Sequence, residues 1–291
     1  MTDPDAGLEP GFTAPPGACD AHFHVFGPMA EYPVGASDLR YEPPHAPLGD
    51  YLALVRRLGF ERFVFVQPSA YGMDNSCMLD AMRELGAGVC RGIVHLDERT
   101  TTDPEIDLLH AAGVRGVRVN ISPIRKVEPG LADALRPRIE ALAARLHEVG
   151  WHIDFLLPGW LITELMPTLR ALPVQFSVAH MGLFPAALGP GQAGFRQFLE
   201  LVGDGSGRCW PKLTGIYRFS TEPGFADVGP FAQALMERAP EQLLWGSDYP
   251  HLSFHDRVGS VQLFNLFGIW APDAAMRERI LVGNPARLFD F

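Results

Sequence analysis

Histidine and aspartate side chains gather in one short stretch of the sequence, CDAHFHVFGP at residues 19–28. His22 and His24 are one residue apart and follow Asp20, in a run that otherwise has the composition of a buried strand. Residues two apart on a strand leave on the same face, so Asp20, His22 and His24 are predicted to form one polar row. Two imidazoles in such a row can bind a metal ion, hold an anionic oxygen, or satisfy each other inside a core.

Two further groups of the same kind lie near the ends of strand-like runs. His180 closes the run QFSVAHM, and Asp248 lies in LLWGSDYP. A single buried histidine is most often structural, but two histidines on one strand, a third histidine and an aspartate at matching positions favour chemistry. We therefore interpret His22, His24, His180 and Asp248 as the catalytic set, in which an ionised Asp248 can accept a proton.

Short β-rich runs alternate with amphipathic stretches along the chain, which predicts an α/β fold of the (β/α)8 TIM-barrel class. The predicted strands are 18–26, 62–68, 90–96, 113–121, 151–157, 175–181, 209–217 and 243–250. The predicted helices include 50–60, 75–86, 131–150, 161–172 and 231–239. We expect one barrel domain over residues 18–291, ending in a C-terminal helix, after a flexible Pro- and Gly-rich lead-in at 1–17.

Catalytic groups of this fold class lie where strands end and loops begin. The longest loop, residues 28–47, follows the first predicted strand and carries Tyr41. We predict that it forms a lid or a wall of the substrate pocket.

Composition excludes several classes of partner. The formal net charge is −10, which disfavours nucleic acid and anionic membrane surfaces. No run approaches the roughly 18 apolar residues of a membrane span. The first residues lack the basic start and apolar middle of a signal peptide, and the four cysteines show no C-x-x-C spacing. We expect a cytoplasmic protein that acts on a small substrate, and the sequence leaves a homo-oligomer open.

Taken together, these motifs resemble the amidohydrolase superfamily: H-x-H on the first strand, a histidine ending the sixth and an aspartate ending the eighth. More narrowly, CDAHFHVFGP, VQPSAYGMDNS, RGVRVN, AHMG, WGSDYPH and NPARLF are similar to the branch that contains 2-pyrone-4,6-dicarboxylate lactonase. The resemblance covers residues 19–291. It implies a hydrolase that opens a small acidic lactone, in aromatic or sugar-acid catabolism, without a metal. On that model the three histidines contact the carbonyl oxygen and Asp248 takes a proton from water.

The metal content stays open between none and one divalent ion. Superfamily members with two metals share a bridging lysine on the fourth strand, whereas RGVRVNI offers Arg118 and Asn120 there. His152 begins the fifth strand, at the end opposite the catalytic face, so we interpret it as structural. If a single ion is bound, zinc suits the donors best, and its ligands would be His22, His24, His180 and Asp248.

Arginines indicate an anionic substrate, since a guanidinium can donate two parallel hydrogen bonds to a carboxylate. The resemblance implies that Arg118, Arg125 and Arg218 clamp substrate carboxylates and that Ser69 hydrogen-bonds substrate. Tyr41 and His251 complete the predicted substrate-binding set. The lactonase pattern has a further arginine after HMG, where this chain has Leu183. This departure favours a substrate with fewer charges and an apolar flank.

Three alternatives to a lactonase remain. A zinc-dependent decarboxylase of the same superfamily shares the histidine and aspartate set, and so does an amide hydrolase. A barrel that only binds a small molecule is the non-enzyme alternative, which the retention of Asp248 disfavours.

Overall fold

The computed structural model describes residues 4–36, 39, 41–121 and 126–291 of the chain. Arg125, one of the predicted carboxylate-binding residues, lies outside the described residues. Among the helices within these ranges, none is both long and apolar enough to cross a bilayer.

Eight β-strands form one parallel sheet in which each strand neighbours the next along the chain. The strands are β1 Cys19–Phe23, β2 Arg62–Val66, β3 Cys90–Val94, β4 Val114–Asn120, β5 His152–Leu156, β6 Phe176–Val178, β7 Cys209–Leu213 and β8 Leu244–Trp245. Strands that follow chain order and alternate with helices define the (β/α)8 class. The predicted fold class is therefore confirmed.

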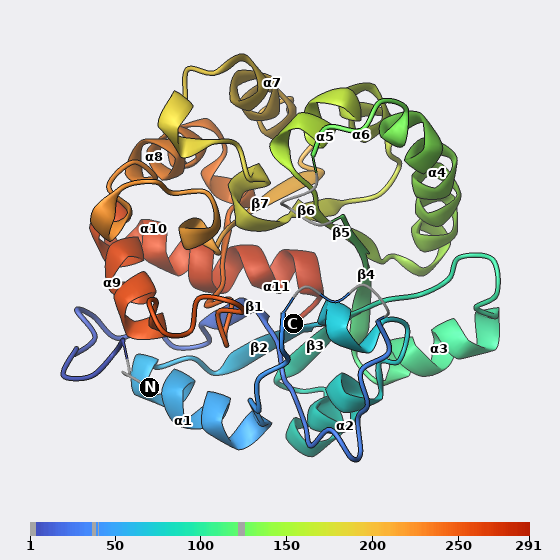
Figure 1. Ribbon diagram of the computed structural model, residues 1–291, viewed down its shortest axis with the longest axis horizontal. Coiled ribbons are helices and arrows are strands. Elements are labelled where there is room, and N and C mark those ends of the chain that lie inside the picture. Colours follow the sequence, from blue (N-terminus) through green and yellow to red (C-terminus); the bar gives the residue numbers. More distant parts are fainter. Residues whose placement is uncertain (1–3, 37–38, 40, 122–125) are drawn as a thin grey trace. The chain divides into compact units, whose positions relative to one another are not determined.

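One compact unit comprises Met1–Asp97, Thr101–Arg115 and Trp245–Phe291. It holds β1, β2 and β3, and Figure 1 shows α1 and α2 flanking these strands. Its helices are α1 Leu48–Leu58, η1 Ser69–Tyr71, α2 Ser76–Leu85, α3 Asp103–Ala111, α9 Ser260–Trp270, α10 Ala274–Glu278, η7 Arg279–Gly283 and α11 Asn284–Phe289.

A second compact unit comprises Glu98–Thr100 and Gly116–Leu244, and it holds most of β4 together with β5, β6 and β7. Its longer helices are α4 Leu131–Val149, α5 Gly159–Glu164, α6 Met166–Ala171, α7 Ala193–Val202 and α8 Gly229–Arg238. Its short helical turns are η2 Ala179–Gly182, η3 Ala186–Leu188, η4 Ile216–Arg218, η5 Pro223–Phe225 and η6 Pro240–Gln242.

Hydrophobic spacing explains why these elements form. Helix α1 buries Tyr51, Leu52, Val55 and Leu58, which recur every three or four residues and so share one face. The helix ends at Gly59, whose φ of 92° is left-handed and costs glycine little. All five residues of β1, β3 and β5 are buried, which is the pattern of parallel strands covered on both faces.

All eight strands are shorter than the sequence predicts, and β6 and β8 are the shortest. The runs 175–181 and 243–250 shrink to Phe176–Val178 and Leu244–Trp245. Beyond these ends His180 has φ 54° and Asp248 has φ 56°, in the left-handed region that an extended strand excludes. The predicted catalytic residues therefore lie on the turns that follow β6 and β8, rather than within the strands.

The long loop after β1 is anchored within its own unit. Tyr32 donates its hydroxyl proton to Asp80 of α2 over 2.9 Å. The backbone N–H groups of Gly35 and Ala36 donate to the carbonyl of Ala70 in η1. Over residues 28–36 and 41–47, the loop is thus tied to the segments that follow β2.

Part of the segment expected to be a flexible lead-in packs against α9. The Phe12 ring stacks on Phe264 with a centroid distance of 4.1 Å. The Asp5 carboxylate accepts hydrogen bonds from the backbone N–H groups of Val261 and Gln262, in the first turn of that helix. Flexibility of residues 1–17 stays a prediction.

Candidate active site

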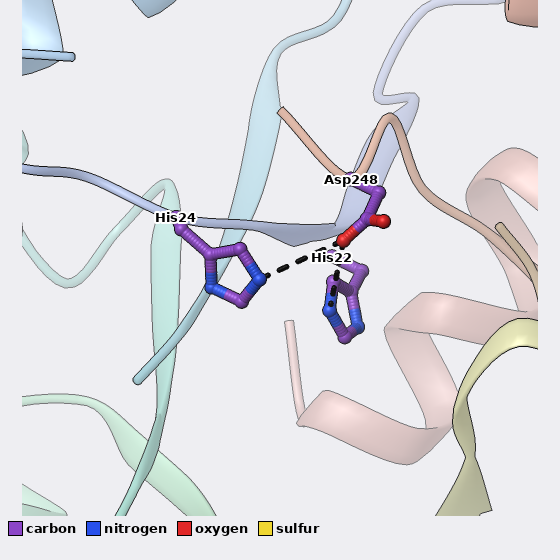
Figure 2. A group of neighbouring side chains, drawn as sticks. All are labelled: His22, His24 and Asp248. Carbon is purple, nitrogen blue, oxygen red and sulfur yellow. Dashed lines mark ion pairs between the residues drawn. The ribbon is translucent and has the colours of Figure 1, made fainter. Parts of the chain in front are cut away.

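Three of the predicted catalytic side chains converge at the ends of β1 and β8 (Figure 2). His22 lies in β1, His24 directly follows it, and Asp248 lies on the turn after β8. Asp248 Oδ1 is 3.6 Å from Nε2 of His22 and 3.6 Å from Nε2 of His24. All three residues are buried. The structure therefore places one carboxylate oxygen between two imidazole nitrogens.

Backbone hydrogen bonds hold this arrangement in place. Asp248 N–H donates to the His22 carbonyl over 2.9 Å, and His24 N–H donates to the Tyr249 carbonyl over 2.8 Å. Gly246 lies so close that a Cβ there would be 2.6 Å from the His22 Cβ. Only glycine fits this approach, so the segment that carries Asp248 lies directly against β1.

The tautomer of His24 follows from its other ring nitrogen. Nδ1 lies 2.7 Å from the carbonyl oxygen of Val66 at the end of β2. A carbonyl oxygen only accepts hydrogen bonds, so Nδ1 carries the proton and donates. In the neutral ring, Nε2 then presents its lone pair toward the side where Asp248 lies.

Asp20 differs from the prediction of a single polar row. The pairing of β1 with β2 shifts register between Asp20 and Phe23, which interrupts the regular alternation. The Asp20 carboxylate accepts from the Tyr51 hydroxyl of α1 and from the backbone N–H of Ser247. Burial raises the pKa of Asp20 to about 6, opposed by the hydrogen bonds that it accepts.

The three converging residues fit a single divalent ion. Each offers one donor atom, and these atoms all lie within 4.8 Å of one another. Two imidazole nitrogens and a carboxylate oxygen are suitable zinc ligands, and three protein ligands leave a position open for chemistry. The hydrogen bond from His24 Nδ1 to Val66 is the kind of outer contact that orients a ligand histidine.

Other predicted site residues lie in the same unit. Tyr41 and Ser69 pair through their hydroxyl groups over 3.1 Å, and the Tyr41 oxygen also accepts from the backbone N–H of Ala70. His251 is buried in the loop after β8, with Nε2 3.1 Å from the Ser260 hydroxyl. These hydrogen bonds hold Tyr41, Ser69 and His251 within the unit. That they contact substrate stays a prediction.

Arg118, His180 and Arg218 belong to the second unit. His180 is buried in the turn after β6, and a Cβ on Gly215 would lie 2.1 Å from its Nδ1. Gly215 has φ 56°, so both its backbone and its missing side chain require glycine. Arg218 stacks its guanidinium over the Tyr217 ring, 5.2 Å from the centroid.

Arg118 lies in a buried charged network on β4 to β7. Its Nε is 3.8 Å from Asp154 Oδ2, while Asp154 Oδ1 contacts Lys212 Nζ at 2.7 Å and accepts from the Ser177 hydroxyl at 2.6 Å. Strand register aligns Arg118 with Asp154 and Asp154 with Ser177, so the network follows one layer of the sheet. These contacts make Asp154 a carboxylate of the sheet layer, with Lys212 and Ser177 as its short-range partners.

Leu183 ends the turn that contains His180. It packs with Leu156 and Ala179, and Phe219 covers this cluster. The lactonase pattern carries an arginine at this position. Here the residue is a leucine, and its neighbours in this cluster are apolar as well.

Sequence reasoning missed residues that contact Asp20 and His22 and so support the site. Tyr51 reads as an ordinary buried residue of α1, and Ser247 and Gly246 read as turn residues. Their partners lie far away along the chain, so nothing in their local spacing identifies them. Gly215 lies inside the predicted strand 209–217, and its contact with His180 depends on the fold.

Known proteins with this sequence pattern identify the family. The family model described as Amidohydrolase matches residues 19–291. A 4-sulfomuconolactone hydrolase of Rhizobium radiobacter is 38% identical, with 96% of this chain and 91% of that protein covered. A 2-pyrone-4,6-dicarbaxylate hydrolase of Comamonas testosteroni is 35% identical, with 97% and 92% covered.

A solved structure shows the same architecture. It is a putative 2-pyrone-4,6-dicarboxylic acid hydrolase from Pseudomonas putida, with a TM-score of 0.81 and 33% identity. The match covers 94% of this chain and 97% of that one. This chain belongs to the amidohydrolase family.

Proposed function

We propose that this protein hydrolyses the ring ester of a small acidic lactone, with Asp248 as the general base. The observation that carries the proposal is the buried position of Asp248 Oδ1, 3.6 Å from Nε2 of both His22 and His24. This cluster supplies a proton acceptor beside two nitrogen groups that can hold a carbonyl oxygen. Relatives named as lactone hydrolases support the reaction type.

The chemistry needs one base and one oxyanion site. A water oxygen attacks the lactone carbonyl carbon while its proton passes to Asp248. The carbonyl oxygen becomes an oxyanion, which the histidines stabilise by donating Nε2–H. For His24 this requires the imidazolium form, because its Nδ1–H already donates to Val66. The tetrahedral intermediate then collapses, the ring C–O bond breaks, and the leaving oxygen takes the proton back from Asp248. The product is an open chain with one new carboxylic acid, which ionises and releases a proton to solvent.

His180 is the third proposed histidine of the oxyanion site. It follows β6 in the way that Asp248 follows β8, and active sites of this fold class are built at the carboxyl ends of the strands. Its buried ring and the glycine required beside it support a functional position.

A bound divalent ion would add Lewis acidity at the carbonyl group. His22, His24 and Asp248 would hold it, and His180 is the proposed fourth ligand. The residues present are suited to this arrangement and to a metal-free site alike.

Arg118 and Arg218 are proposed to bind an anionic group of the substrate, together with Arg125. Arg118 supports this role because its guanidinium is buried on β4, beside the Asp154 carboxylate. Leu183 and its apolar neighbours favour a substrate with an uncharged flank over a fully symmetric dicarboxylate. Ser69, Tyr41 and His251 are the proposed polar contacts.

A cytoplasmic location is part of the proposal. All four cysteines are buried and none forms a disulfide, which suits a reducing compartment. Light scattering of the purified protein tests whether it forms a homo-oligomer.

A panel of lactones, followed by proton release and by carbon dioxide release, tests the function. The protein should be purified without added metal and analysed for bound ions in parallel. We expect ring opening of a lactone that carries at least one acidic group. Release of carbon dioxide with essential zinc would instead identify a decarboxylase, and turnover of amides alone would identify an amide hydrolase.

A further inference from the structure

The Asp20 carboxylate is a buried acceptor on which backbone N–H and hydroxyl donors converge, the Ser247 hydroxyl among them. Its Oδ1 accepts from the backbone N–H of Ser247 at 3.0 Å and from that of His22 at 3.2 Å. Its Oδ2 accepts from the Tyr51 hydroxyl at 3.0 Å. Asp20 and Tyr51 have no exposed surface. One side chain thus joins β1, α1 and the turn after β8.

The backbone donors belong to the candidate site or lie next to it in the chain. Ser247 precedes Asp248 in the chain. The backbone N–H of Asp248 also donates to β1, to the His22 carbonyl. The Tyr51 ring stacks on Phe23 at a centroid distance of 3.7 Å, so its hydroxyl is held rigidly. Moving Asp20 would therefore shift the turn that carries Asp248 relative to both histidines.

We propose that Asp20 is a positioning residue that sets where the Asp248 carboxylate lies between His22 and His24. It acts through the Ser247 and His22 backbone, while Tyr51 orients it from α1. This inference rests on the proposed function for its kinetic consequence. Its geometric consequence, the location of Asp248, is independent of any substrate.

The role depends on hydrogen-bond acceptance and not on charge, which separates two substitutions. Asp20→Ala removes every one of these acceptor contacts. Asp20→Asn retains an acceptor oxygen for the two backbone N–H groups, and its amide can donate to the Tyr51 oxygen. Tyr51→Phe keeps the ring that stacks on Phe23 and removes only the hydroxyl.

The experiment combines kinetics on a lactone that the wild type hydrolyses with crystal structures of the variants. Misplacement of a reacting group by about 1 Å can cost up to roughly 100-fold in rate. We expect kcat to fall by about 10- to 100-fold in Asp20→Ala, with KM within about twofold of wild type. Tyr51→Phe should lose less, and Asp20→Asn should retain most of kcat. In the Asp20→Ala structure, the Asp248 oxygen should move away from the positions 3.6 Å from the two Nε2 atoms.

Ile106→Ala is the matched control for general destabilisation. Ile106 is a buried residue of α3 in the same unit. We expect Ile106→Ala to lower the melting temperature and to leave kcat unchanged. A positioning defect such as that of Asp20→Ala lowers kcat.

Several results would overturn the inference. A folded Asp20→Ala protein with unchanged kcat and an unmoved Asp248 contradicts it. If Asp20→Ala does not fold, folded Asp20→Asn and Tyr51→Phe decide: equal and severe losses of kcat in both refute the positioning role. A wild type that hydrolyses no lactone refutes the proposed function alone, because the structures still report whether Asp20 sets the location of Asp248.

Discussion

Replacing Arg118 by methionine tests the proposed binding of an acidic substrate. Methionine keeps much of the side-chain length and removes every N–H donor. Arg118 is almost wholly buried, so solvent cannot replace the lost donors. Asp154 keeps two short partners, Lys212 and Ser177, when the guanidinium is removed. The fold should therefore survive.

The magnitude follows from the hydrogen bonds that the substrate loses. A hydrogen bond to a charged group contributes about 1.5–3 kcal/mol. We expect a loss of about 2–3 kcal/mol, which corresponds to roughly a 30- to 150-fold rise in KM. The value of kcat should change little if ground and transition states use the contact equally.

Initial rates on a carboxylated lactone and on its uncharged analogue provide the assay. The rise in KM should be confined to the carboxylated substrate. Arg196→Met, on the exposed face of α7 in the same unit, serves as the control and should leave both substrates unaffected. Unchanged KM for the carboxylated lactone, or an equal rise for both substrates, would refute the assigned role of Arg118.

Three smaller predictions concern the loop, the pocket flank and the turn beside His180. Tyr32→Phe removes a donor to Asp80, whose pKa lies below its usual range, first through Arg83 and then through Tyr32. That pKa should rise toward its ordinary value, as read by carboxyl NMR. Leu183→Arg should raise kcat/KM for a dicarboxylated lactone relative to a singly charged one, and lower the melting temperature because it disrupts an apolar cluster. Gly215→Ala should abolish most activity by displacing the His180 ring.

Each has a control or a contrary outcome. The Asp80 contact stabilises the fold above the usual carboxyl pKa and is lost as pH falls through the folded value, so an unchanged acid profile in Tyr32→Phe would contradict it. A folded Leu183→Arg protein with an unaltered substrate ratio would show that this turn does not flank the substrate. Gly150→Ala carries a similar positive φ with no atom within 4 Å, so it should lose stability and keep activity.

The sequence predicted the fold class and the site's core because both depend on local pattern. Hydrophobic runs of strand length alternate with amphipathic helices, and this alternation alone indicates the strand order. His22 and His24 are one residue apart in the chain, so their proximity needs no tertiary information. Asp248 followed from its place at the end of the eighth strand-like run.

Features that depend on distant partners could not be predicted. Strand alternation placed Asp20 beside the two histidines, but a register shift and the contacts from Tyr51 and Ser247 determine its surroundings. The runs 175–181 and 243–250, which contain His180 and Asp248, were read as longer strands. Left-handed backbone is enriched at His and Asp but still uncommon there, so residue type alone does not reveal it.

Asp248→Asn, assayed for kcat on the lactone that the wild type hydrolyses, tests the central claim most directly. Asparagine keeps the size of the side chain and removes the basic carboxylate that lies 3.6 Å from each imidazole. General-base catalysis contributes roughly 10²- to 10⁴-fold, so kcat should fall by at least about 100-fold while the protein stays folded. A folded Asp248→Asn protein with near-normal kcat would contradict the role of Asp248 as the base.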